Sequence, residues 1–132
     1  MKAKIAAGFA VAVAVVAIGC ASAGVERGPQ GTIAYLVEIE SSEPGARVEA
    51  NGDYIGNTPT TLKIFGDKDG TFHNFGSSDY VIRVFPVKTN QFVQTRVFRT
   101  GGWFAQEDMI PKRLFFDLSE RSETFSIDKP RY

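Results

Sequence analysis

The chain has 132 residues, enough for one domain, and its 15 acidic and 15 basic residues cancel at neutral pH. This balance leaves no concentrated basic surface of the kind that binds nucleic acid, so no nucleic-acid partner is expected. The single cysteine excludes an internal disulfide and a multi-cysteine zinc site, and neither a metal nor a cofactor is predicted.

The first 19 residues have the pattern of a secretory signal peptide. Lys2 and Lys4 give a short positive head, and the residues from Ile5 to Gly19 are uncharged and mostly apolar. An uncleaved membrane anchor is the alternative, but this stretch is shorter than the roughly 20 residues that span a bilayer as a helix. A removed signal peptide is therefore the favoured reading.

The signal ends in Ala17-Ile18-Gly19-Cys20, which resembles the bacterial lipobox. The resemblance implies cleavage before Cys20 and attachment of lipid to its thiol. Several acyl chains on one cysteine would anchor the protein stably, because each buried methylene contributes about 0.8 kcal/mol. Ala21, a non-acidic residue after the cysteine, favours the outer membrane by the same resemblance. An ordinary signal peptide cut after Ala23 would instead discard Cys20.

Beyond the signal we expect a lipidated cysteine and flexible tether over residues 20–32, a β domain over 33–118 and a polar tail over 119–132. The tether is rich in glycine and polar residues and has no apolar period. In the domain, apolar residues recur at every second position, as in half-buried strands. The sets that share a face are Tyr35, Val37 and Ile39; Leu62 and Ile64; Tyr80, Ile82 and Val84; Val93, Thr95 and Val97; and Leu114, Phe116 and Leu118. The pattern predicts an all-β fold, a small antiparallel β-sandwich without helices.

Asn51-Gly52 predicts a tight hairpin, because a type I′ turn needs positive φ at both central residues. A two-residue loop pairs Ala50 with Asp53, Glu49 with Tyr54, and Val48 with Ile55. Val48 and Ile55 are expected to point to the core.

The segment around this hairpin is similar to the PEGA domain. The residues that fit the family pattern are Ser42, Pro44, Gly45, Ala46, Val48, Asn51, Gly52, Gly56, Thr58 and Pro59. The tetrapeptide that names the family is not literal, since this chain reads Glu43-Pro44-Gly45-Ala46. The resemblance extends over about Val37 to Val97. It implies a small β-sandwich-like module of bacterial envelope proteins.

The turn residues of this motif have a structural explanation. Pro44 and Gly45 turn the chain between strands, Asn51 and Gly52 close the hairpin, and the segment from Gly56 to Pro59 leads out of it. None of these side chains can transfer a proton or attack a substrate. The motif therefore specifies a fold, and a fold alone does not give a function.

Few side chains are candidates for chemistry. His73 is the single histidine and would need an orienting acid and a nucleophile beside it to act as a base. Asp67-Lys68-Asp69-Gly70 has the wrong spacing for a calcium loop. Glu107 and Asp108 are adjacent, and nothing places them across a cleft as in a glycosidase. Charged turns are the simpler interpretation of both acidic segments.

Aromatic residues gather in or beside two long loops, namely Phe65, Phe72, Phe75, Trp103 and Phe104. A weak candidate binding surface consists of Phe72, His73, Trp103 and Phe104, because loop aromatics stack on sugars or anchor protein partners. The alternative is that these rings cap the open ends of the sandwich.

The sequence therefore predicts a lipid-anchored envelope protein, not an enzyme, whose β module binds or scaffolds a protein partner. Binding of peptidoglycan or another glycan through Phe72, His73 and Trp103 is the second hypothesis. A hydrolase that uses His73 and a domain that serves only as a spacer remain as alternatives.

Overall fold

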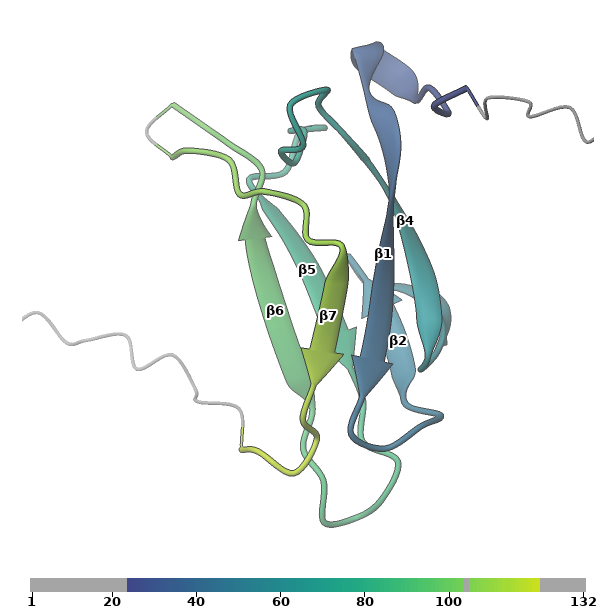
Figure 1. Cartoon of the computed structure of the whole chain (residues 1–132). Helices are drawn as coiled ribbons and strands as arrows, with labels where there is room; N and C mark the ends of the chain where they lie inside the picture. Colours follow the sequence, from purple (N-terminus) through teal and green to yellow (C-terminus); the bar gives the residue numbers. More distant parts are fainter. Residues whose placement is uncertain (1–23, 104, 122–132) are drawn as a thin grey trace, which may run out of the picture.

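The computed structural model describes residues 24–103 and 105–121 and shows an all-β fold, as predicted. The strands are β1 (Ile33–Ser41), β2 (Arg47–Ala50), β3 (Asp53–Asn57), β4 (Thr60–Gly66), β5 (Asp79–Val84), β6 (Gln94–Arg99) and β7 (Arg113–Phe116). They form two facing sheets, in the orders β4-β1-β7 and β3-β2-β5-β6 (Figure 1). Within the described residues, no helix is long and apolar enough to cross a bilayer.

The core lies between the two sheets and consists of the inward residues of the alternating strands. The core residues of β1, β4, β5 and β7 fall at alternate positions, which confirms the predicted period. The inward residues are Val37, Ile39, Leu62, Ile64, Leu114 and Phe116 from one sheet and Val48, Tyr80, Ile82 and Val84 from the other. Leu118, just past β7, is also buried.

Strand β6 presents its apolar residues in an unexpected way. Phe98 packs against the core, so Val97, its neighbour in the strand, faces outward and is 50% exposed. Val93, immediately before the strand, is also exposed. Both alternating faces of this segment contain an apolar residue, so the sequence pattern alone could not decide which face is buried.

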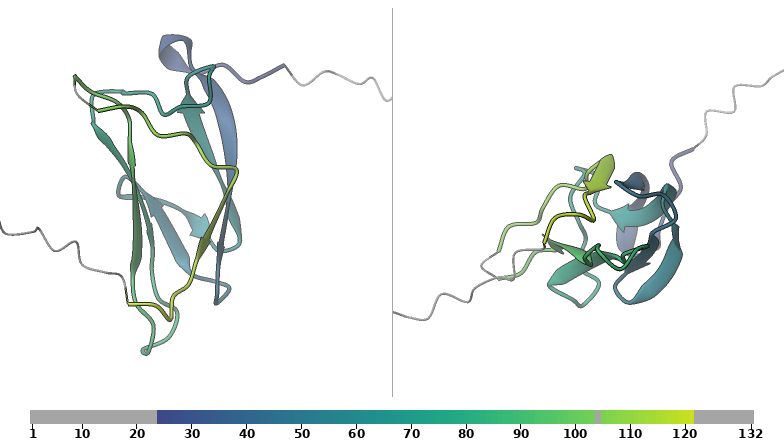
Figure 2. Two further views of the ribbon diagram at one scale, coloured as in Figure 1. Left: turned by 60° about the vertical axis from the view of Figure 1, so that its left-hand side comes forward. Right: turned by 90° about the horizontal axis from the view of Figure 1, so that it is seen from below.

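The expectation of an antiparallel sandwich is wrong for one strand pair. β7 runs parallel to β1, with Ile39 opposite Leu114 (Figure 1). After β6 the chain crosses from one sheet to the other before it enters β7, and Figure 2 shows this crossing in yellow-green. The β6–β7 connection, residues 100–112, is long enough for β7 to begin at the same end of the sandwich as β1, as parallel pairing requires.

The predicted hairpin between β2 and β3 is confirmed at its turn. Asn51 and Gly52 have φ values of 50° and 85°, as a type I′ turn needs. The pairing of Val48 with Ile55 is wrong, because the register shifts there and Val48 lies opposite Gly56. Ile55 is the extra residue of this bulge, and it still packs against the core.

Gly52→Val is expected to lower the free energy of unfolding by about 1–2 kcal/mol, because a side chain is disfavoured at positive φ. Gly102→Val is a matched control. A Cβ at either glycine would meet no atom within 4 Å, but only Gly52 has a positive φ. Urea unfolding of both variants measures the difference, and equal midpoints would show that the turn does not depend on the backbone of Gly52.

The end of the expected tether is part of the domain. The Ala34 N–H donates to the Glu26 carbonyl at 2.8 Å, and Arg27 forms a bridge with Ile33. A short 3-10 turn follows at Pro29–Gly31, and Thr32 is buried. The prediction of a flexible tether up to residue 32 is therefore wrong for residues 26–32. Local glycines and polar residues gave no sign of this pairing.

The first residues after the predicted C-terminal boundary of the domain also contact it. The Phe92 N–H donates to the Leu118 carbonyl at 2.9 Å, and the Gln94 side chain donates to the Glu120 carbonyl at 2.6 Å. The first residues of the predicted polar tail thus contact the start of β6. Residues 122–132 of that tail lie outside the described part of the chain, as do Cys20 and the predicted signal peptide.

Candidate binding surfaces

Three segments meet at one end of the sandwich, and we call this region the loop end. It comprises the N-terminal segment 26–32, residues 66–78 around the β4–β5 loop, and residues 100–103 and 105–110 of the β6–β7 loop, and it lies at the top of Figure 1. The Phe72 N–H donates to the Asp108 carbonyl at 3.0 Å and the Ile110 N–H to the Gly70 carbonyl at 2.8 Å. These bonds join the β4–β5 loop to the β6–β7 loop, so the loop end is held together by tertiary contacts.

His73 lies in the loop end with both ring nitrogens engaged. Its Nδ1 is 2.8 Å from Asp67 Oδ1, and its Nε2 is 3.0 Å from Gln30 Oε1. The acid that a catalytic histidine needs is present, but an amide oxygen occupies the place of a nucleophile. Ser77, a candidate nucleophile by sequence proximity, instead donates its hydroxyl to the Asp79 carbonyl at 3.0 Å. The histidine thus connects the N-terminal turn to the β4–β5 loop.

A hollow of about 360 Å³ adjoins this histidine. Its lining is polar and consists of Asp67, His73, Asn74, Thr100, Gly101, Gly102 and Glu107. Asn74 donates to the Gly101 carbonyl at 2.8 Å, which holds the two sides of the hollow together. Acidic and amide groups next to a loop aromatic are a combination that hydrogen-bonds and stacks on sugars.

The loop aromatics separate into core and surface residues. Phe72 is only 1% exposed, with ring centroids 4.9 Å from Phe98 and 5.3 Å from Tyr80. Its predicted place in a binding surface is therefore wrong, and the capping alternative holds for this ring. Phe75 and Trp103 are 48% and 96% exposed, while Phe104 lies outside the described residues. Phe65 is half-buried, so Phe75 and Trp103 are the two of the five aromatics that the structure describes as exposed.

Two ionisable groups near these rings have perturbed acidity. Burial, and secondly the charge of Asp53, raises the pKa of Tyr80 to about 12. Hydrogen bonds from Thr71 hold the pKa of Asp69 below its ordinary value, with the hydroxyl at 2.7 Å and the N–H at 3.1 Å from Oδ1. Asp69 thus closes a turn. No group of three or more His, Cys, Asp or Glu side chains in the described part of the chain is placed to hold a metal.

The second candidate surface is the open edge of β6, which is the last strand of its sheet. The backbone of Arg99 makes two hydrogen bonds to Asp108 on the side away from β5: the Asp108 N–H donates to the Arg99 carbonyl at 2.9 Å. The Arg99 N–H donates to Asp108 Oδ2 at 2.7 Å. Because backbone groups alternate in direction along an antiparallel strand, Thr95 and Val97 point to this same side. No described strand pairs with them there.

No local sequence pattern marks this edge. Thr95 and Val97 have the same local pattern as residues of an interior strand, and only the order of strands in the sheet makes them an edge. They lie at an edge because β6 pairs with β5 alone among the described strands.

The two sheets also bring the predicted turn residues together. The Gly45 N–H donates to the Thr58 carbonyl at 2.7 Å, and the Ala46 N–H donates to Thr58 Oγ1 at 3.0 Å. Pro44 and Gly45 thus lie in the turn from β1 to β2, directly against the segment that leads from β3 to Pro59 and β4. At this joint the chain passes from one sheet to the other and back, since β1 and β4 belong to one sheet and β2 and β3 to the other. Its residues are the turn residues that the sequence motif contains.

The family model of the PEGA domain matches residues 34–68. The match spans β1 to β4, including the hairpin and the joint around Thr58. It covers less than the stretch from Val37 to Val97 over which the sequence resemblance extends, since it ends before β5. Comparison with curated proteins and with solved structures gives no significant match. The PEGA domain thus accounts for the first four strands, and both candidate surfaces lie mainly outside it.

Proposed function

We propose that the chain is a lipid-anchored bacterial envelope protein whose β domain binds an extended segment of a protein partner along β6. The observation that carries the proposal is the open edge at Thr95 and Val97. Lipid attaches at Cys20, and the alanine after it favours the outer membrane. The role is binding or scaffolding, without catalysis.

The open edge has the properties of a strand-addition site. An unpaired strand edge presents N–H and C=O groups that pair with an incoming extended chain. The edge is bounded on one side by the pairing of Phe92 with Leu118 and on the other by that of Arg99 with Asp108. The partner segment that fits between these boundaries is short. Exposed Val93 and Val97 on the outer face add apolar contact area beside it.

A non-catalytic role is supported by the surroundings of the single histidine. Asp67 and Gln30 take both ring nitrogens, so His73 holds two segments together. A hydrolase would need one of these nitrogens to face a nucleophile or a water at the hollow.

Val97→Pro is expected to abolish capture of the partner, because proline removes the N–H that a strand on this edge would use. Val97→Thr is the matched control, since it keeps the N–H and the β-branched shape, and it should retain capture. The measurement is crosslinking of the lipidated protein in intact cells, followed by identification of the attached protein. Equal capture by Val97→Pro and the unmodified chain would reject the edge as the binding site.

The hollow beside His73 favours a second candidate, binding of peptidoglycan or another glycan. Its lining offers Asp67, Asn74 and Glu107 as hydrogen-bonding groups, and Phe75 contacts His73 with ring centroids 4.6 Å apart. Co-sedimentation with purified sacculi tests this function. Binding that soluble cell-wall fragments compete away would support it over a protein partner.

A further inference from the structure

The position of the loop end relative to the lipid anchor follows from chain length. Glu26 is the first of the described residues that pairs with β1, through its carbonyl at 2.8 Å from the Ala34 nitrogen. Glu26 lies six positions after Cys20. Whatever conformation the chain between them adopts, its covalent reach is at most about 20 Å. A lipid on Cys20 would therefore keep the loop end close to the bilayer surface.

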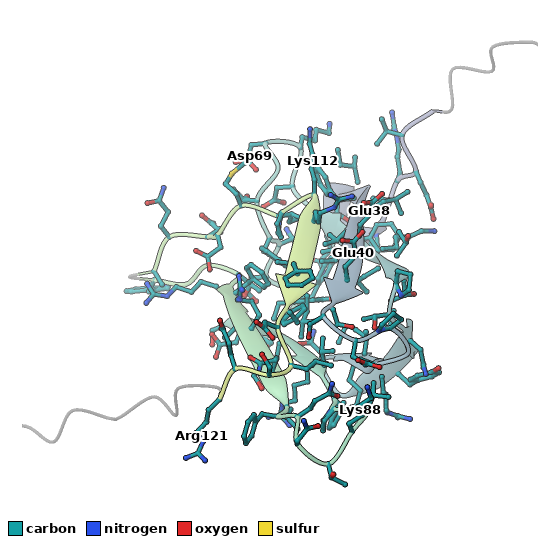
Figure 3. The ribbon with its side chains drawn as sticks, turned by 60° about the horizontal axis from the view of Figure 1, so that its bottom comes forward. Glu38, Glu40, Asp69, Lys88, Lys112 and Arg121 are labelled. Atoms are coloured by element: carbon teal, nitrogen blue, oxygen red, sulfur yellow. The ribbon has the colours of Figure 1, made fainter. Side chains whose placement is uncertain are left out.

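The opposite end of the domain is farther away. β1 has nine residues, which corresponds to a length of about 30 Å. Figure 3 shows Asp69 and Lys112 toward one end of the molecule and Lys88 and Arg121 toward the other. The tether therefore keeps the loop end within about 20 Å of the anchor, whereas the end with Lys88 lies a further strand length along the domain.

The loop end presents apolar side chains that suit the interface of a bilayer. Trp103 is 96% exposed, and Met109, Phe75 and nearby Val25 are also exposed. Tryptophan favours the boundary between headgroups and acyl chains, because its ring is apolar and its N–H is polar. The bridge between Thr71 and Met109 fixes one of these positions relative to the β4–β5 loop.

We propose that the loop end lies against the lipid surface, with Trp103 inserted at the headgroup boundary. The proposal rests on the lipid at Cys20 from the proposed function. The loop end has more acidic residues (Glu26, Asp67, Asp69, Glu107 and Asp108) than basic ones (Arg27 and Lys68). Attraction to anionic lipid therefore does not drive the contact, and the partner is a zwitterionic lipid surface reached by apolar side chains. In this orientation the hollow beside His73 faces the membrane, while the β6 edge stays accessible from the side.

The experiment uses the fact that Trp103 is the single tryptophan of the chain. The lipidated protein is reconstituted into phosphatidylcholine vesicles, with and without bromine on the acyl chains near the headgroups. Interfacial helices and side chains enter on the order of 5–10 Å, which is within reach of such bromines. The Trp103 emission should move to shorter wavelength and lose most of its intensity in the brominated vesicles.

The control variant moves the tryptophan to the other end, as Trp103→Phe combined with Val87→Trp. Val87 is exposed in the β5–β6 loop, next to Lys88. Its emission should be the same in both vesicle types. Urea unfolding of both proteins checks that the exchange leaves the fold intact.

The outcomes separate this inference from the lipid anchor. Flotation with the vesicles and selective quenching of Trp103 support the inference. Flotation with no quenching at Trp103, or with equal quenching at both positions, overturns it and leaves the anchor standing. Failure to float overturns both. A shift of Trp103 emission on sacculi but not on vesicles would identify the loop end as a glycan surface and also overturn the membrane contact.

Discussion

Phe72→Ala is expected to lower the free energy of unfolding by about 3–5 kcal/mol. The ring is buried between Phe98 and Tyr80 and joins the β4–β5 loop to the four-stranded sheet. Its removal loses apolar burial and leaves a cavity that fixed backbone cannot fill. The loss is a large part of the 5–15 kcal/mol that typically stabilises a domain, so part of the variant should be unfolded at 37 °C.

Phe75→Ala is the matched control for this substitution. It removes the same ring three positions along the same loop, but from a side chain that is 48% exposed. We expect a change of about 0.5 kcal/mol or less, as for most surface substitutions. Urea unfolding followed by far-ultraviolet circular dichroism measures both midpoints. Similar midpoints for the two variants would show that Phe72 is not a core residue.

Cys20→Ser is expected to move the protein from the membrane fraction to the soluble fraction of the cell. The thiol is the only group of the chain that the lipobox resemblance assigns to lipid, and serine cannot form the thioether. Two or three acyl chains would bind a bilayer so tightly that the soluble fraction of the unmodified protein is negligible. Cell fractionation and mass determination of the mature protein measure the change.

Ser22→Ala is the control for this substitution, since it lies two positions away and leaves the lipobox unchanged. It should stay with the membrane. Membrane retention of Cys20→Ser would point to an uncleaved apolar anchor. An unmodified protein that begins after Ala23 and carries no lipid would instead identify an ordinary signal peptide and remove the basis of the anchor.

The proposed anchor and the proposed binding edge are compatible in one arrangement. The β6 edge runs along the domain from the end near Lys88 toward the loop end. If the loop end rests on lipid, a strand added to β6 would extend away from the bilayer. A partner could then be captured at the membrane surface without passing between the domain and the lipid.

The sequence by itself determined what depends on near neighbours in the chain. The period of two placed the inward residues of β1, β4, β5 and β7, because alternation in a strand needs no knowledge of its partner. Asn51-Gly52 specified the hairpin turn for the same reason, since positive φ is a property of single residues. The motif from Ser42 to Pro59 was enough to find the PEGA domain, because its turn residues are contiguous.

Tertiary structure alone decided which strands are neighbours and which faces are open. Phe72 is a core residue because its ring packs against Tyr80 of β5 and Phe98 of β6. These contacts join a loop to two strands and leave no mark in the local sequence. His73 is hydrogen-bonded to Gln30, 43 positions away, and no local sequence pattern predicts such a contact. Among the described strands, β7 pairs with β1 and with no residue of β6, so β6 is left at the edge of its sheet. Such contacts arise from the order of strands, which is set by packing of the whole core and not by any one segment.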